Sequence, residues 1–450
     1  MSGSRAEGLG RPEPGRDHRW LVLAFVSLAM FGNYYVFDAL NPVGPLLTRD
    51  LGFSKSQIGL LDTAYNVAAL LVLVAGGVVV DRVGTMRAMV AFAAVTAAGG
   101  FLVAWAPGFG GMAAGRFVLG LGAEPLIVAA TTVLGRWFKG KELSLAMALN
   151  LTVARLGSVA ADNSASWAAP LFRSWRPPLL LAAAVGLVGV AGGLAYALVE
   201  RSAARRFALG RAGPADRLVP RDLVRFDRAY WLVVGLCVAF YSAVFPFRRF
   251  ANLLFVDAHG ASPEAAGFLN GLLPAMALVA TPVFGFLVDR IGKRALLMAG
   301  GSLLLVPAFL MLGYTRLPLA VPVSMIGVSF SLVPAVMWPA VTYLVEERRL
   351  GTAYAVMTFC QQVGWAVTSW ALGFANDAAG ASAANPQGYR PGMLFLAGLG
   401  VAGLVLSALL LGVERGPGAH GLETITTREP RPDSTPVPEN HRGAGQSGAS

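Results

Sequence analysis

Two charged residues, Glu124 and Arg155, lie in the middle of long apolar stretches of the chain. Each stretch, 111–135 and 144–167, is long enough for a helix, and a short basic turn at 136–144 joins them. The two charges are almost equally far from the centre of this turn, roughly 23 Å along each helix at about 1.5 Å per residue. We therefore expect two antiparallel helices that bring Glu124 and Arg155 to the same depth.

A charge in the middle of an apolar helix needs a partner or a cavity, because its insertion into a bilayer costs at least about 2.5–3.5 kcal/mol. An acid binds an ammonium group, and the planar fork of an arginine binds a carboxylate through two hydrogen bonds. Glu124 and Arg155 could thus bind the two ends of a zwitterionic solute. The alternative is a structural salt bridge that pins the two helices together.

The two halves of the chain repeat each other, since the segment 143–149 resembles the segment 350–356 at an offset of 207 residues. The same offset places Ser331 opposite Glu124 and Gln362 opposite Arg155. Neutral polar groups would then face the charged pair. We predict as substrate-binding residues Glu124, Arg155, Gln362, Ser331, Asp38 and Trp338.

The composition excludes most other classes of protein. The chain of 450 residues is 55% hydrophobic and 14% charged, with a mean hydropathy of +0.60, which ordinary soluble domains do not reach. The two cysteines lie inside apolar runs and the four histidines lie outside them. The sequence shows no disulfide framework, metal-ligand spacing or nucleophile–base arrangement. We expect neither an enzyme nor a cofactor.

Twelve apolar segments reach the length that spans a membrane, about 17–25 residues. We place them at 20–42, 57–80, 87–106, 111–135, 144–167, 178–199, 230–252, 264–288, 295–314, 317–344, 351–375 and 392–413. The sequence thus predicts an all-α integral membrane protein with twelve transmembrane helices in two six-helix bundles, 20–199 and 230–413. The remaining segments are a cytoplasmic N-terminal tail (1–19), a cytoplasmic central loop (200–229) and a disordered cytoplasmic tail (414–450).

The basic net charge of +11 follows from topology. Most of the 36 Lys and Arg residues fall on one side of the predicted spans, which the positive-inside rule assigns to the cytoplasm. We therefore expect the lipid bilayer and a small-molecule or peptide substrate as partners, and no nucleic acid. The need for an accessory subunit is left open.

One short motif, Gly-x-x-x-Asp-Arg-x-Gly, occurs twice, 208 residues apart. Glycine permits a tight turn, aspartate can accept hydrogen bonds at a helix N-terminus, and basic residues meet cytoplasmic carbonyls and lipid phosphates. A repeat this long implies two homologous halves. We expect the two loops to hold the cytoplasmic side closed. The residues of this gating motif are Gly77, Asp81, Arg82, Gly84, Gly285, Asp289, Arg290 and Gly292.

Four further charges lie within or at the ends of the predicted spans. Asp38 is either a cavity-lining carboxylate or a solvated charge at a helix end. Arg116 either extends to the membrane interface or has a functional role. Arg248 and Arg249 are neighbours on one helix and point about 100° apart, so we expect one to face the site and the other to meet lipid headgroups.

The doubled motif, the twelve spans and the long central loop resemble the major facilitator superfamily. Further stretches are similar to one branch of it, the lysosomal dipeptide transporter family. These stretches are Gly115–Glu124, Trp137–Leu143, Ala154–Ser158, Val244–Phe247, Val283–Asp289 and Leu350–Tyr354. The resemblance implies uniport of short peptides, with a preference for those that contain a basic residue. It also implies that Glu124 and Arg155 bind the amino and carboxyl ends of the peptide.

The leading hypothesis is a transporter of small zwitterionic solutes, above all dipeptides, that works by alternating access. A Glu124 kept ionised by a nearby Arg155 favours uniport. One alternative is a proton-coupled exporter of drugs or metabolites with Glu124 as the protonation site. An alternative of another class is a non-transporting membrane sensor or scaffold. The Ala-, Gly- and Arg-rich style suggests a bacterial cytoplasmic membrane, whereas the family resemblance implies a lysosomal one.

Overall fold

The computed structural model describes residues 14–138, 141–207, 223, 225–417 and 419–424, without the side chains of residues 74–82 and 204–205. Almost all of this chain is helical. The first half contains α1 (Arg16–Asp38), α2 (Leu40–Leu51), α3 (Lys55–Val83), α4 (Thr85–Trp105), α5 (Phe109–Phe138), α6 (Leu143–Asp162), α7 (Ser164–Trp167), η1 (Ala169–Arg173) and α8 (Arg176–Arg206). The second half contains α9 (Arg228–His259), α10 (Pro263–Ile291), α11 (Arg294–Tyr314), α12 (Ala320–Leu344), η3 (Glu347–Arg349), α13 (Leu350–Ala378), η4 (Pro386–Tyr389) and α14 (Arg390–Glu414).

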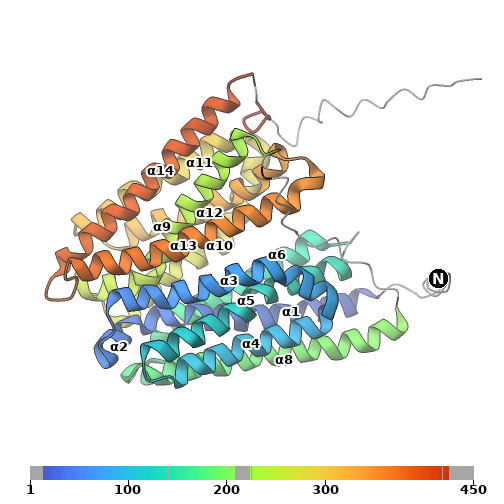
Figure 1. Cartoon of the computed structure of the whole chain (residues 1–450), viewed down its shortest axis with the longest axis horizontal. Coiled ribbons are helices and arrows are strands. Elements are labelled where there is room, and N and C mark those ends of the chain that lie inside the picture. Colours follow the sequence, from blue (N-terminus) through green and yellow to red (C-terminus); the bar gives the residue numbers. More distant parts are fainter. Residues whose placement is uncertain (1–13, 139–140, 208–222, 224, 418, 425–450) are drawn as a thin grey trace, which may run out of the picture.

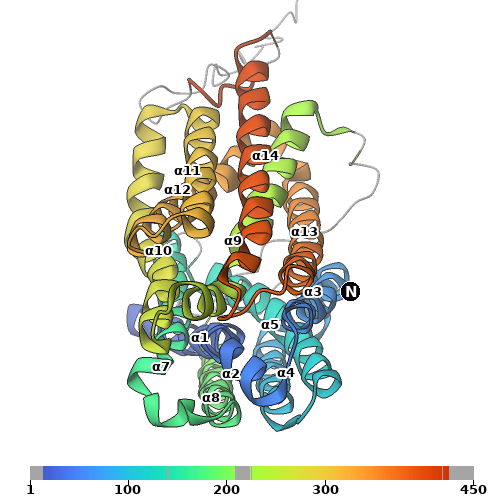
Figure 2. The ribbon, with the colours of Figure 1, turned by 90° about the vertical axis from the view of Figure 1, so that its left-hand side faces the viewer.

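The long helices form two bundles that lie side by side (Figure 1). In the first bundle α1 packs against α6 and α8, while α4 packs against α5 and α8. In the second, α14 packs against α9 and α11, and α12 packs against α10 and α11. The bundles meet where α3 contacts α13, α6 and α7 contact α10, and α2 contacts α9. Figure 2 looks onto the end of the molecule where α2 and α7 lie beneath α9 and α10.

Each predicted span coincides with one long helix of the described chain, usually within a few residues at each end. There are two exceptions. The span 20–42 continues past the end of α1 at Asp38 into α2, and the span 144–167 continues past the end of α6 at Asp162 into the short α7. Eleven stretches are long and apolar enough to cross a membrane by length and composition. The long helix α13 is not among them. It carries the polar residues Gln361, Gln362 and Ser369 on buried positions, which lowers its hydropathy.

The two bundles are joined tightly at the ends that the charge bias assigns to the outside, which we call the outer side. The carboxylate of Asp377 on α13 accepts hydrogen bonds from the backbone N–H groups of Lys55 (2.8 Å) and Ser56 (2.7 Å), at the start of α3. Gly59 of α3 and Gly373 of α13 lie so close to the opposite helix that a Cβ on either would overlap a carbonyl oxygen. Toward the end where α1 begins, the bundles splay apart (Figure 1).

At the opposite ends of the helices, which the charge bias assigns to the cytoplasm and which we call the cytoplasmic side, the chain beyond α14 folds back onto the second bundle. We call residues 419–424 the clasp. The side chain of Leu422 in the clasp is fully buried. The carboxylate of Glu423 accepts a hydrogen bond from the backbone N–H of Ala295 (2.7 Å), at the start of α11. Part of the segment 414–450, expected to be a disordered tail, is therefore packed against helices, and residues 425–450 lie outside the described chain.

The clasp also contacts α9 and α14 through one imidazole. His420 Nε2 lies 2.6 Å from Asp227, the N-cap residue of α9, and His420 Nδ1 lies 2.9 Å from Glu414 at the end of α14. The clasp thus connects the cytoplasmic ends of three helices, α9, α11 and α14. Most of the predicted central loop lies outside the described residues, and α8 continues into it as far as Arg206.

Candidate substrate-binding cavity

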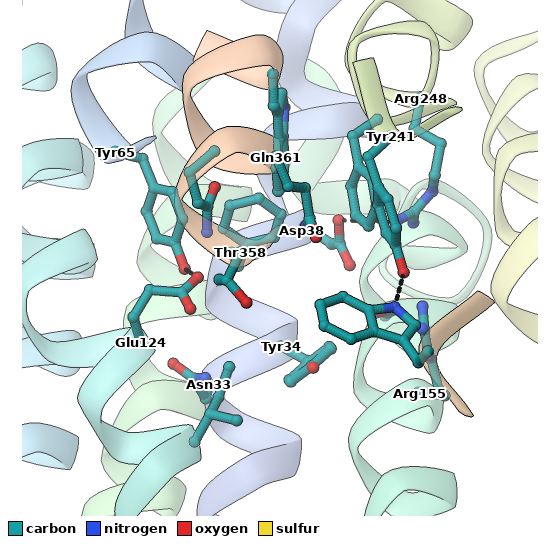
Figure 3. A pocket seen from close by; sticks show the side chains of 17 residues that line it. Asn33, Tyr34, Asp38, Tyr65, Glu124, Arg155, Tyr241, Arg248, Thr358 and Gln361 are labelled. Atoms are coloured by element: carbon teal, nitrogen blue, oxygen red, sulfur yellow. Dashed lines mark hydrogen bonds and ion pairs between the residues drawn. The ribbon is translucent and has the colours of Figure 1, made fainter. Parts of the chain in front are cut away.

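A cavity of about 250 Å³ lies between the two bundles (Figure 3). Helices α1, α3, α5 and α6 line it from the first bundle, and α9, α12 and α13 line it from the second. The lining residues are Asn33, Tyr34, Phe37, Asp38, Tyr65, Glu124, Ile127, Arg155, Ser158, Tyr241, Phe245, Arg248, Trp338, Thr358, Gln361, Gln362 and Trp365. The cavity therefore combines charged groups with aromatic walls, as small-molecule sites do.

Glu124 enters the cavity from α5, where it is half-buried. The hydroxyl of Tyr65 on α3 donates a hydrogen bond to its carboxylate at 2.8 Å. The amide of Gln362 on α13 approaches the same carboxylate from the second bundle. The carboxylate thus has neutral hydrogen-bond partners, and within the described chain it forms no ion pair.

Arg155 enters from α6 and is also half-buried. Its guanidinium lies over the ring of Phe330 at 4.9 Å from the centroid, a cation–π contact with the second bundle. Among the residues that the structure describes, no carboxylate forms an ion pair with it. Beside it, the indole N–H of Trp338 donates to the hydroxyl of Tyr241 at 2.9 Å.

Glu124 and Arg155 form no ion pair with each other in the described chain, which contradicts the alternative of a structural salt bridge between them. The two side chains come from opposite sides of the cavity and face each other across it (Figure 3). The physical reason is that α6 packs along α1, which contributes Asn33 and Tyr34 to the wall between the two charges. The helices are antiparallel neighbours in sequence but not close neighbours along their length. A salt bridge that pins them together is therefore absent in this part of the chain.

The other predicted site residues divide into two groups. Gln362, Trp338 and Asp38 line the cavity as expected. Ser331 does not: its side chain is fully buried, and its hydroxyl donates to the carbonyl of Gly327 at 2.8 Å within α12. The repeat offset does not predict the direction in which the side chain of Ser331 points.

Seven of the seventeen residues that line the cavity are aromatic, and sequence reasoning missed most of these seven. Tyr34, Phe37, Tyr241 and Phe245 were not singled out, although all four line the cavity. The ring of Phe245 lies 4.2 Å from that of Trp365, centroid to centroid. Phe, Trp and Tyr make up 10% of the chain, so an aromatic residue in an apolar run carries little signal by itself.

Two clusters of buried charges join the bundles between the cavity and the outer side. In the first cluster, Arg248 of α9 lies 2.7 Å from Asp162 and 3.4 Å from Asp38. In the second, Asp62 of α3 accepts Arg116 at 3.1 Å and Arg249 at 2.7 Å. We call these the Asp162 cluster and the Asp62 cluster.

These clusters exclude one of the two alternatives that the sequence left open for Arg116 and for Asp38, and they correct the expectation that one of Arg248 and Arg249 meets lipid headgroups. Arg116 does not extend to the interface, because its buried guanidinium is paired with Asp62. Arg249 does not meet headgroups, because its buried guanidinium pairs with Asp62 inside the protein. Asp38 is not a solvated end charge but is 2% exposed and paired with Arg248. Asp62 and Asp162 were missed, since each lies at the edge of a span where an aspartate is ordinary.

The gating motif is described in full only in its second copy. Asp289 is 59% exposed and lies 3.8 Å from Arg294 of its own bundle. Arg290 lies over the ring of Phe286, at 4.3 Å from the centroid, on the same helix. A Cβ at Gly285 would meet nothing within 4 Å, so this glycine is not required for close packing here.

The last glycine of the motif does make a turn in both copies. Gly84 has φ of 84° and precedes α4, and Gly292 has φ of 63° and ends α10. Such positive φ angles favour glycine. The side chains of Asp81 and Arg82, and the surroundings of Gly77, lie outside the described residues. Closure of the cytoplasmic side by these loops remains a prediction.

Comparison with known proteins identifies the family. The Major Facilitator Superfamily sequence profile matches residues 26–369 and 250–433. This chain belongs to the major facilitator superfamily. The transporter is 32% identical over 378 residues to the lysosomal dipeptide transporter MFSD1 of Danio rerio, which covers 81% of this chain and 82% of that protein. It is 31% identical over 384 residues to MFSD1 of Homo sapiens, covering 82% of each.

Solved structures of the superfamily confirm the fold of this transporter. A mutant form of the nucleoside transporter NupG superposes with a TM-score of 0.71 at 13% identity, covering 87% of this chain and 99% of that chain. A bacterial homolog of the human lysosomal transporter Spinster, in an inward-facing and occupied conformation, gives 0.71 at 16% identity, with 89% and 98% covered. The chain is thus a multi-pass membrane transporter with the major facilitator fold, as the sequence predicts.

Proposed function

We propose that this transporter moves small zwitterionic solutes, dipeptides above all, by alternating access. The observation that carries the proposal is the placement of Glu124 and Arg155 on opposite sides of one cavity. Neither side chain has an ion-pair partner in the described chain. A zwitterion can contact both at once and give each the counter-ion that it lacks.

The separation of the two charges favours a dipeptide over a single amino acid. In a free amino acid the ammonium and carboxylate are bonded to the same carbon. A dipeptide places them on successive Cα atoms, about 3.8 Å further apart. Because Glu124 and Arg155 are not within ion-pair distance of each other, the longer zwitterion fits the cavity better. The MFSD1 relatives, which are named dipeptide transporters, support this choice.

The walls suit peptide side chains of several kinds. Tyr34, Phe245 and Trp365 offer ring faces on which an apolar side chain can pack, and a cation can lie over the same faces. Asp38 lines the cavity but is already paired with Arg248. We therefore assign binding of the peptide's termini to Glu124 and Arg155, and contact with its side chains to the aromatic wall.

Capped peptides test the assignment of each end. Acetylation removes the ammonium charge that Glu124 would bind, and amidation removes the carboxylate that Arg155 would bind. Each cap should cost the wild type about 2–5 kcal/mol of binding free energy, as loss of one partner of a desolvated charge pair does. In Glu124→Gln the acetyl cap should add little further cost, and in Arg155→Lys the amide cap should add little.

The measurement is ligand-induced thermal stabilisation of the purified protein, together with counterflow of labelled dipeptide in liposomes. Glu264→Gln and Arg176→Lys make the same chemical changes at exposed positions on the outer side and should behave as wild type. Equal stabilisation of Arg155→Lys and wild type by an uncapped dipeptide would remove Arg155 from the site. Counterflow of amino acids but not of dipeptides would show that the substrate is an amino acid and not a dipeptide.

One observation favours a second candidate, a proton-coupled exporter of drugs or metabolites. The expected argument for uniport rested on a nearby Arg155 that keeps Glu124 ionised, and the structure separates the two. With Tyr65 and Gln362 as partners, Glu124 could exchange a proton during transport. Uphill efflux of a cationic drug driven by a pH gradient, and its loss in Glu124→Gln, would favour this candidate. For either candidate we propose a bacterial cytoplasmic membrane as the location.

A further inference from the structure

The ends of α1 and α6 bring two carboxylates, Asp38 and Asp162, to a single guanidinium of the second bundle. Arg248 lies 3.4 Å from Asp38 and 2.7 Å from Asp162. The amide of Asn41 donates to both carboxylates, at 3.2 Å and 2.8 Å. All four side chains are buried. Two acids thus share one counter-ion, and the Asp162 cluster has one negative charge in excess.

The neighbouring Asp62 cluster supplies the opposite excess. There one acid, Asp62, pairs with two cations, Arg116 and Arg249. Arg249 also donates to the side-chain oxygen of Asn41 at 2.6 Å, which links the two clusters. Among the described residues, Tyr34 is a further titratable group that faces Asp38. Together the clusters are neutral, with three carboxylates and three arginines.

Opening of the outer side would distribute these six charges unequally between the two bundles. Arg116 and the three carboxylates belong to the first bundle, whereas Arg248 and Arg249 belong to the second. When the bundles separate, Asp62 keeps Arg116, but Asp38 and Asp162 lose Arg248. Two carboxylates that close together, at the edge of a low-dielectric core, repel each other strongly. Binding of one cation removes the repulsion.

A second observation indicates that the cation is a proton. Asn270 of α10 is fully buried, and its amide nitrogen lies 3.4 Å from Asp162. Its side-chain oxygen is a buried acceptor that receives no hydrogen bond from the residues that the structure describes. As the bundles close, a proton still on Asp162 would find this acceptor beside it, before Arg248 displaces it. Among the described residues no group of three or more His, Cys, Asp or Glu could bind a metal ion.

We propose that Asp38 and Asp162 form a proton-binding site that is loaded when the outer side opens. The pair takes up one proton from outside as Arg248 leaves. The returning Arg248 displaces that proton, by way of Asp38, into the cavity that Asp38 lines. Opening toward the outside is then linked to external acidity. This inference rests on the alternating access of the proposed function but not on the identity of the solute.

Accessibility of a buried cysteine tests the site without any solute. Val43 of α2 is 0% exposed, and α2 packs against α9, so a cysteine there reacts only when the outer side opens. The background replaces the two native cysteines, as Cys237→Ala and Cys360→Ala. A membrane-impermeant maleimide is added outside right-side-out vesicles, with the internal pH fixed. Leu317→Cys, at a position 47% exposed on the outer loop, corrects for the pH dependence of the reagent itself.

The corrected labelling of Val43→Cys should rise as the external pH falls from 8 to 5.5. For one bound proton the slope approaches about tenfold per pH unit at most. Asp38→Asn and Asp162→Asn should each flatten the slope, because a single remaining carboxylate has no like-charged neighbour. Arg248→Gln should be labelled strongly at every pH, since nothing then displaces the proton.

Asp257→Asn is the matched control. Asp257 forms another ion pair between the bundles, with Lys55 at 3.5 Å, outside both clusters. Its replacement should raise labelling at all pH values and leave the slope unchanged. A flat profile in the unmodified background, or an unchanged slope in both Asp38→Asn and Asp162→Asn, would overturn the proposal. Weak labelling of Val43→Cys in the Arg248→Gln variant would also overturn the proposal. None of these results would affect dipeptide binding by Glu124 and Arg155.

Discussion

The indole N–H of Trp365 donates to the carboxylate of Asp62 at 2.8 Å. The ring of Trp365 lines the cavity, while Asp62 is the central acid of the Asp62 cluster. One side chain therefore contacts both the place where a solute would bind and the charges that join the bundles. A bound solute that moves the ring would therefore change the hydrogen bond to Asp62, and with it the contacts that close the outer side.

Removal of this one hydrogen bond should weaken the outer closure. Trp365→Phe keeps an aromatic wall but leaves one carboxylate oxygen of Asp62 without its indole donor. We expect the free energy of unfolding to fall by about 1.5–3 kcal/mol, which is typical for loss of a hydrogen bond to a charged group. We also expect increased external labelling of Val43→Cys. Thermal unfolding and the labelling assay measure the two effects. Trp370→Phe, on the exposed face of the same helix, should change neither.

Replacement of Arg116 and of Arg249 should affect external labelling differently, although both arginines pair with the same oxygen of Asp62. Arg249→Gln removes a contact between bundles and should increase external labelling of Val43→Cys. Arg116→Gln removes a contact within the first bundle, leaves Asp62 to Arg249 alone, and should not increase labelling. Both variants should lose thermal stability, because each removes one member of a buried ion cluster. Equal labelling of the two variants would show that the contact of Asp62 with Arg249 holds the bundles together no more than its contact with Arg116 does.

A methyl group at the interface of α3 and α13 should prevent outer closure. Gly59→Ala and Gly373→Ala each place a Cβ against a carbonyl oxygen of the opposite helix. We expect Val43→Cys to be labelled at every pH in either variant. Gly300→Ala is the control, since a Cβ there meets nothing within 4 Å. Low labelling of Gly59→Ala at pH 8 would contradict the close approach of the two helices.

Two truncations test the clasp. A chain that ends at Gly416 loses Leu422 and the hydrogen bond from Ala295 to Glu423, whereas a chain that ends at Thr424 keeps both. Loss of a fully buried leucine costs about 2–5 kcal/mol, so the shorter chain should unfold at a lower temperature. The longer chain should unfold as the full-length protein does. Equal melting of the two truncated proteins would show that the clasp adds no stability.

The sequence predicts the helices well because apolar length and charge bias are local properties. Both ends of α4 and α14, for example, lie within two residues of the predicted spans. The depth of Glu124 and Arg155 also follows from counting along two helices. Their separation does not, because it depends on α1, which no count along α5 and α6 includes.

The outer clusters could not be predicted for a related reason. An angle of about 100° between neighbours on a helix suggested that Arg248 and Arg249 could not both have buried roles. Each nevertheless finds its own acid, Asp162 or Asp62, because α9 is surrounded at this level by helices of both bundles. The paired residues are 86 or 187 positions apart in the sequence, so their pairing depends on the tertiary fold and cannot be predicted from either segment alone.

The modest hydropathy of α13 has a consequence for the synthesis of the protein. The helix that supplies Gln361, Gln362 and Trp365 to the cavity is the one long helix of the described chain not apolar enough, by composition, to cross a membrane. Insertion machinery recognises spans by their apolarity, so α13 should enter the bilayer together with the very apolar α14 or against helices already in place. A substitution that adds a further polar residue to α13 would then impair membrane insertion, before any solute binds. The last helical hairpin, α13 and α14, would be left on the wrong side of the membrane.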